Sequence, residues 1–135
     1  MSIKRNDAFT VIEILIVVAI IATICAIIIP NLFMARRTAN ESAAKSNLRG
    51  MSTAAETLNA AKNHYPNDLE EFETYLPSVK SFCSDLAGAK TQQKGYEYSC
   101  VSDVNGYTFE ASPITAGVTG NIIYTITTGV ILTPS

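Results

Sequence analysis

A single apolar segment near the N-terminus places the strongest constraint on what this chain folds into. It runs from Phe9 to Pro30 as FTVIEILIVVAIIATICAIIIP, and Glu13 is its one charged residue. From Ile14 to Ala35 the chain carries no charge. This run of about 22 residues, at about 1.5 Å rise each, is long enough to cross a hydrocarbon layer about 30 Å thick. The sequence therefore predicts a helix that spans a membrane at some stage of the protein's life.

Composition limits what the rest of the chain builds and binds. The chain has 135 residues, so about 100 remain for one small domain outside the apolar segment. A formal net charge of -2 provides no basic field of the kind that nucleic-acid binding requires, and we exclude nucleic acid as a direct partner. The residues suggest no nucleophile with a base, no phosphate-binding glycine loop and no metal cluster. We therefore expect no enzyme, no cofactor and no metal site.

The residues around the start of the apolar segment match a known pattern. Lys4 and Arg5 precede an apolar run that exceeds the roughly 7 to 15 residues of a secretory signal. The string AFTVIEILIVVAIIATICAIIIPNL, from Ala8 to Leu32, resembles the N-terminal segment of the type IV pilins and the type II secretion pseudopilins. The resemblance implies that a prepilin peptidase cuts between Ala8 and Phe9 and methylates the new amino group of Phe9. Those families usually have Gly before the cut, where this chain has Ala.

Two further residues acquire roles from the resemblance. Glu13, the fifth residue after the cut, would neutralise the amino group of Phe9 on a neighbouring subunit during assembly. The physical argument agrees, because a carboxylate in apolar surroundings needs a cation. The alternative is that Glu13 merely lies in the headgroup region. Pro30 stands at the family's usual proline position, and since proline lacks a backbone donor and clashes with the preceding turn, we expect a helix kink there.

The segment after the apolar run is predicted to continue the helix with an amphipathic face. Apolar residues recur there at alternating spacings of four and three, namely Ala44, Leu48, Met51, Ala55 and Leu58. This spacing is typical of a helix with one buried face. We expect a single helix from about Phe9 to about Asn63. The apolar stripe alone is also compatible with a coiled coil, but we favour packing onto the C-terminal half, because that half needs a cover.

The C-terminal part is expected to form a small antiparallel sheet of about four strands. YEYSCVS (96–102) and YTFEASP (107–113) flank the turn signal DVNG, which predicts a hairpin. NIIYTIT and VIL supply two shorter strands. A helix laid on such a sheet is an α+β fold, and it resembles the globular head of the pilins. Asp103 and Asn105 are expected to serve the turn rather than calcium, because calcium takes about 6 to 8 oxygen ligands.

Two cysteines in the polar part predict a disulfide. In an exported domain of this size, Cys83 and Cys100 would most often be bridged. The alternative, two free thiols in a cytosolic domain, requires the opposite topology. Cys25 lies in the apolar run, where it packs as a small apolar residue.

These expectations divide the chain into a leader (1–8), an apolar transmembrane or filament-core helix (9–35) and a periplasmic or extracellular head (36–135). The head comprises the helix continuation (36–63), a loop region (64–93) and the sheet (94–133). The resemblance implies a structural subunit of a type IV pilus or pseudopilus. It would be anchored in the inner membrane as a precursor and assembled by inner-membrane machinery with copies of itself and other pilin-like subunits. The alternative is a single-pass, membrane-anchored extracytoplasmic binding domain, which has no evident need for Glu13.

Overall fold

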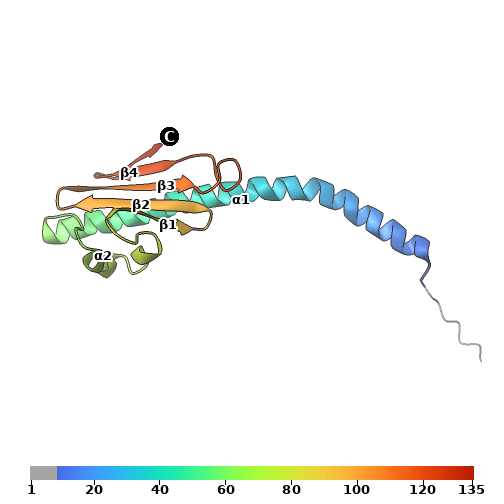
Figure 1. The fold of residues 1–135 in the computed structure, drawn as a ribbon, viewed down its shortest axis with the longest axis horizontal. Coiled ribbons are helices and arrows are strands. Elements are labelled where there is room, and N and C mark those ends of the chain that lie inside the picture. The colour runs from blue at the N-terminus through green and yellow to red at the C-terminus, as the bar shows by residue number, and fades with distance from the viewer. Residues whose placement is uncertain (1–8) are drawn as a thin grey trace, which may run out of the picture. The chain divides into compact units, whose positions relative to one another are not determined.

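The computed structural model describes residues 9–135, so the expected leader and Ala8 lie outside the described residues. The chain divides into two compact units between Ala35 and Arg36. Helix α1 contributes to both units, and every other element belongs to the second (Figure 1). The elements are α1 (Val11–Lys62), α2 (Leu69–Tyr75), the 3-10 helix η1 (Val79–Ser81), β1 (Ala87–Gln93), β2 (Tyr96–Asp103), β3 (Gly106–Pro113), β4 (Tyr124–Thr127) and β5 (Ile131–Pro134).

Helix α1 is continuous through the residues where the sequence predicts one long helix. Pro30 lies inside it, and the residues on both sides of Pro30 are helical. The proline removes one backbone donor from the helix. The side chain of the following residue bonds to the helix backbone nearby, where Asn31 Nδ2 donates to the Ile27 carbonyl at 3.2 Å. The helix therefore does not end at Pro30, and the kink remains a prediction.

The second unit is an antiparallel sheet laid along the C-terminal half of α1 (Figure 1). The five strands follow chain order, β1-β2-β3-β4-β5, so each pairs with its sequence neighbour. All five residues of the predicted helix stripe are buried. The inward face of the sheet meets them with alternate residues of three strands, Tyr96, Tyr98, Cys100, Tyr107, Phe109, Ala111, Tyr124 and Ile126. The stripe thus covers the chain's own sheet, as expected, and the coiled coil is not needed.

The central hairpin confirms the predicted turn, while one strand falls outside the expected sheet. β2 and β3 pair from Tyr96↔Pro113 to Asp103↔Gly106. Residues 87–93, expected as part of a loop, instead form β1, which pairs with β2. Their sequence AGAKTQQ lacks apolar alternation because β1 is an edge strand with no fully buried residue. Backbone pairing, which side-chain patterns do not report, holds it in place.

A carboxylate on α1 joins the helix to the sheet. Glu56 Oε1 accepts hydrogen bonds from the Tyr107 hydroxyl at 3.0 Å and from the Gly129 amide at 2.9 Å. Its Oε2 accepts one from Tyr65 at 3.1 Å. Because Tyr107 donates its single proton to Glu56, the 2.6 Å bond between Tyr107 and buried Ser52 has Ser52 as donor. This network connects α1 with β3 and with the turn between β4 and β5.

The buried tyrosines make the head sensitive to alkali. Burial, reinforced by the neighbouring Glu56 carboxylate, raises the pKa of Tyr107 to about 12, and burial likewise raises the pKa of Tyr96 to about 12. In the unfolded chain a tyrosine titrates near pH 10. The raised pKa values therefore stabilise the fold fully below about pH 10, and this contribution is lost as the pH rises toward about 12.

We accordingly expect the urea midpoint of the full chain in detergent to fall steeply between about pH 10 and about pH 12. The Tyr107→Phe variant, which has no phenol at this position, should be less stable at neutral pH but should lose less stability over that alkaline interval. An equally steep alkaline loss in the variant would contradict this assignment to Tyr107.

Candidate functional site

The first unit presents an apolar helix surface that is exposed among the residues that the structure describes. Phe9 is 82% exposed, and Ile20, in the middle of the apolar run, is still 53% exposed. Among the described residues, α1 is the one helix long and apolar enough to cross a membrane. An exposed apolar surface of this extent marks a contact with lipid or with other protein. We call residues 9–35 the assembly helix, after the role that the resemblance implies for them; α1 itself begins at Val11.

The start of the assembly helix is closed by a reciprocal capping arrangement. The Thr10 amide donates to Glu13 Oε2 at 2.7 Å, and the Glu13 amide donates to Thr10 Oγ1 at 3.3 Å. The Thr10 hydroxyl also donates to Glu13 Oε2, at 2.9 Å. This is a capping box, in which a Thr and a Glu three residues later satisfy each other's backbone donors. The T-x-x-E spacing signals it in the sequence, but sequence reasoning directed to filament assembly missed the role of Thr10.

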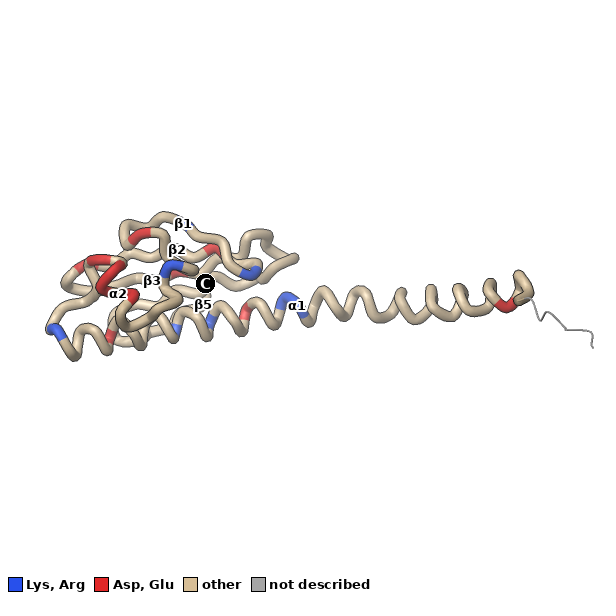
Figure 2. The backbone as a smooth tube through the Cα atoms, turned by 90° about the horizontal axis from the view of Figure 1, so that it is seen from below, with Lys and Arg blue, Asp and Glu red and all other residues tan. Residues whose placement is uncertain are grey.

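Glu13 is the one charged residue in the assembly helix (Figure 2). Within residues 9–135 the hydrogen bonds that the Glu13 carboxylate accepts come from Thr10, and none comes from Phe9. Both bonds that Thr10 donates use the Oε2 atom of the carboxylate. The structure thus fixes the carboxylate at the first turn of the helix, bonded to the residue that follows Phe9. Pairing with an amino group stays a prediction, and Ala8, on the other side of the expected cut, lies outside the described residues.

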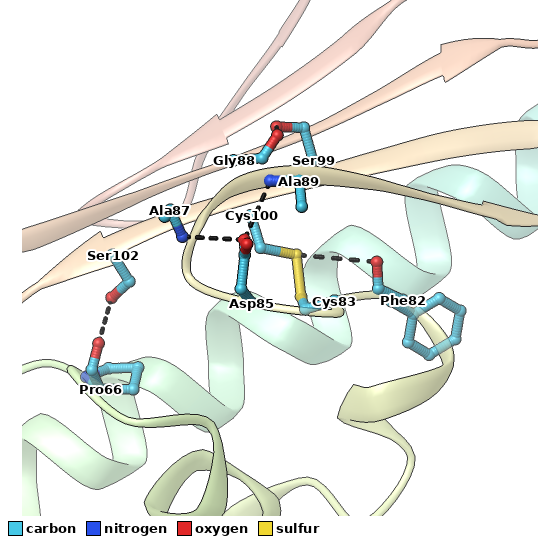
Figure 3. Close-up of a disulfide and its surroundings, with 10 residues drawn as sticks. All are labelled: Pro66, Phe82, Cys83, Asp85, Ala87, Gly88, Ala89, Ser99, Cys100 and Ser102. Carbon is cyan, nitrogen blue, oxygen red and sulfur yellow. Dashed lines mark hydrogen bonds between the residues drawn. A yellow bond between two sulfur atoms is a disulfide. The ribbon is translucent and has the colours of Figure 1, made fainter.

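The expected disulfide joins Cys83 to Cys100, with the two Cα atoms 5.7 Å apart (Figure 3). Both cysteines are fully buried. Cys83 follows η1 and Cys100 lies on β2, so the bridge ties the chain that leads into β1 to β2, the strand that pairs with β1. Asp85 Oδ1 then accepts the amides of Ala87 and Ala89 at 3.0 and 2.9 Å, which turns the chain into β1. The remaining cysteine, Cys25, is free and exposed on the assembly helix.

Acidic groups of the head serve turns, caps and ion pairs in the part of the chain that the structure describes. Asp103 Oδ1 accepts the amides of Asn105 and Gly106 at 2.7 and 3.1 Å, as expected for turn chemistry. Glu71 and Glu73 pair with Lys62 and Lys80, each at 2.6 Å. Over residues 9–135, no three His, Cys, Asp or Glu side chains are grouped to hold a metal ion.

Comparison with known proteins finds two pilus components similar to this chain. The type IV major pilin protein PilA of Myxococcus xanthus is 40% identical over 67 residues, which cover 50% of this chain and 30% of that protein. The type IV wide pilus major component PilA4 of Thermus thermophilus is 40% identical over 65 residues, which cover 48% of this chain and 50% of that protein. No family model matches the chain. The matches span half or less of the length of these relatives, and they support the similarity to type IV pilins that the sequence indicates.

Proposed function

We propose that this relative of type IV major pilins is a structural subunit of a type IV pilus or a related pseudopilus. The observation that carries the proposal is the uncovered apolar helix, which begins with a carboxylate in a capping box and continues into a folded head. Two curated relatives named as pilus components support it. In this proposal the protein is a structural subunit and not an enzyme.

The assembly helix has two successive environments in this scheme. In the precursor it anchors the chain in the inner membrane, with the head outside the cytoplasm. After prepilin peptidase cuts between Ala8 and Phe9, the assembly machinery withdraws the helix from lipid, and it packs against the helices of other subunits. Burying one exposed aliphatic side chain is worth about 1.5–3 kcal/mol in water. Because the helix carries many half-exposed aliphatic side chains such as Ile20, the withdrawn helix is much more stable when packed against other subunits than when exposed to water.

In this scheme, Glu13 makes the filament more favourable than the lipid for the cleaved subunit. A carboxylate costs free energy in the apolar core unless a cation pairs with it. Cleavage creates such a cation at Phe9, so a subunit joining the filament can bring its amino group to Glu13 of its neighbour, or the reverse. The capping box holds the carboxylate at the helix start before this partner arrives. Pairing then needs little rearrangement of the first turn.

Intact mass spectrometry of the protein from its native membrane or from sheared filaments tests the proposal. We expect a mass that lacks residues 1–8 and carries one added methyl group, located on Phe9 by fragmentation. The intact mass should increase by two hydrogens when the disulfide is reduced. An uncleaved chain in both preparations would contradict the proposal and favour an anchored binding domain.

For the alternative function, a membrane-anchored extracytoplasmic binding domain, the described part of the chain offers a candidate surface. An open hollow of 380 Å³ lies beside the β2–β3 turn and the end of β4, lined in part by Asp103, Asn105 and Thr128. This hollow is shallow. A binding function at this hollow does not explain why the membrane segment carries the charged residue Glu13. The filament subunit accounts for both the apolar helix and Glu13, and we prefer it for that reason.

A further inference from the structure

Three segments of the head meet where α1 enters it. The loop from Ile114 to Asn121 packs on the first turns of this part of α1, where Arg37 Nη1 donates to the Gly117 carbonyl at 3.3 Å and Asn40 Nδ2 donates to the Thr119 carbonyl at 3.1 Å. The Asn121 amide donates to Glu41 Oε1 at 2.9 Å. The loop is therefore bonded to α1 at three successive places.

The turn between β1 and β2 joins the same end of the head. The Ile114 amide donates to the Gly95 carbonyl at 3.1 Å. Gly95 also lies directly against the Asn40 side chain and Thr119, so closely that an added Cβ would meet both. Lys94, the neighbour of Gly95 in this turn, is exposed. The loop, the turn and α1 therefore form one continuous end of the head.

This end of the head contains the residues that directly follow the apolar segment in the chain. Arg36 follows Ala35, the last residue of the uncharged run. Asn40 lies about one and a half helical turns beyond Ala35, about 8 Å along the axis at about 1.5 Å per residue. When the assembly helix crosses a membrane, the loop that packs on Arg37 and Asn40 is consequently held near the headgroup layer.

The side chains at this end suit an anionic lipid surface. Val118 is 59% exposed and Ile114 is 44% exposed, and the same end of the head carries Arg36, Arg37 and Lys94. Glu41 is the acidic residue in these contacts, and it accepts the Asn121 amide. We call Arg36, Arg37, Lys94, Ile114 and Val118 the basal surface, which combines three cations with two exposed aliphatic side chains. Figure 2 shows basic positions on α1 and beside the sheet at this end.

The opposite end of the head has a different character. The Tyr65 amide, just beyond the end of α1, donates to the Val104 carbonyl in the β2–β3 turn at 3.3 Å. Helix α2, which follows in the chain, carries acidic residues in its cap and first turn. Val104 is 49% exposed, so a valine of comparable exposure is available there as a control far from the basal surface.

We propose that the basal surface rests on the anionic headgroup layer of the bilayer while the subunit is membrane-anchored, an inference that depends on the anchoring in the proposed function. Aliphatic side chains enter the interface, and neighbouring Lys and Arg side chains are attracted to anionic headgroups. The contact holds the head down on the membrane before assembly. Withdrawal of the subunit into a filament breaks it, so subunit release depends on the lipid charge.

Single-tryptophan fluorescence in vesicles tests this directly, because the chain contains no tryptophan. The full chain carrying Val118→Trp is compared with Val104→Trp in vesicles of phosphatidylcholine and phosphatidylglycerol, with and without brominated acyl chains. We expect a blue-shifted emission that brominated lipid at least halves for Val118→Trp, and an unchanged, water-like emission for Val104→Trp. Ile114→Trp is a second reporter of the same surface, should the loop not tolerate Val118→Trp.

Charge variants and an insertion control separate the outcomes. Adding Arg36→Gln or Lys94→Gln should weaken the contact by about fivefold for each charge removed, which is the effect of one basic residue close to an anionic surface. Quenching of Ile20→Trp reports whether the assembly helix is inserted. Quenching of Ile20→Trp together with no quenching of Val118→Trp or Ile114→Trp would overturn the basal contact and leave the proposed function intact. Absence of quenching at all positions would instead contradict anchoring itself.

Two further results would also overturn the inference. Equal quenching of Val118→Trp in vesicles of phosphatidylcholine alone would show that the basal surface does not recognise headgroup charge. Shielding of Val118→Trp in assembled filaments but not in vesicles would assign this surface to a contact between subunits.

Discussion

Replacing Glu13 by Gln or Ala is expected to leave membrane insertion intact and to reduce incorporation into filaments by roughly a hundredfold or more. The reason is that the amino group of a neighbouring Phe9 would be buried without its counter-charge. Breaking a buried ion pair by removing one partner costs about 3–5 kcal/mol, and about 1.4 kcal/mol corresponds to a tenfold change in an equilibrium. Sheared-filament yield, measured against the amount of subunit in the membrane, reports this loss.

The two substitutions separate charge from helix capping. Glu13 also accepts hydrogen bonds from the Thr10 amide and hydroxyl. Gln serves a capping box as well as Glu does, so Glu13→Gln preserves the start of the helix while removing the charge, whereas Glu13→Ala removes both. Equal, severe losses would support the charge pairing. Normal filaments from Glu13→Gln together with loss in Glu13→Ala would show instead that Glu13 acts through the cap.

A matched acidic control comes from the head. Glu70 lies in the first turn of α2 and is exposed. Glu70→Gln removes the same formal charge from the chain without touching the assembly helix, and it should give normal filament yield. A comparable loss in this control would mean that net charge, rather than the position of Glu13, governs incorporation.

Removing the disulfide is expected to destabilise the head by about 3 kcal/mol, the value for a closed loop of about this length. Cys83 and Cys100 are 17 residues apart and fully buried, so the Cys83→Ala/Cys100→Ala variant loses the covalent constraint on the segment that contains β1. Alanine is chosen because it introduces no buried hydroxyl. The free energy of unfolding, from denaturant titrations in detergent, measures the effect.

Hydrogen exchange locates the same effect in the structure. The bridge anchors the residues before β1, and β1 is an edge strand that pairs with β2 alone. We therefore expect the β1 amides to exchange faster in the variant, before those of β2 and β3 change. Cys25→Ala, on the assembly helix, should alter neither the stability of the head nor its exchange. Unchanged stability in the double variant would contradict a stabilising role for the bridge.

The main elements were predictable because their signals are local and periodic. Leu48 and Leu58 belong to a helical stripe whose spacing alone implies a buried face, and both are fully buried. The central hairpin was indicated by the alternation on both sides of Asp103 and Gly106. Residues 87–93 gave no such signal, because an edge strand with no fully buried position has no apolar period to display.

The order of residues along the chain was enough to predict the long apolar helix, its single charge, the amphipathic continuation and the α+β class of the head. These features follow from apolar length, charge placement and period, which are properties of consecutive residues. The folded chain was needed to show which distant groups meet: the Glu56 carboxylate with Tyr65 and Tyr107, and the loop at Gly117 with Arg37. Such contacts join residues far apart in the chain, and their energy depends on geometry that no local pattern encodes.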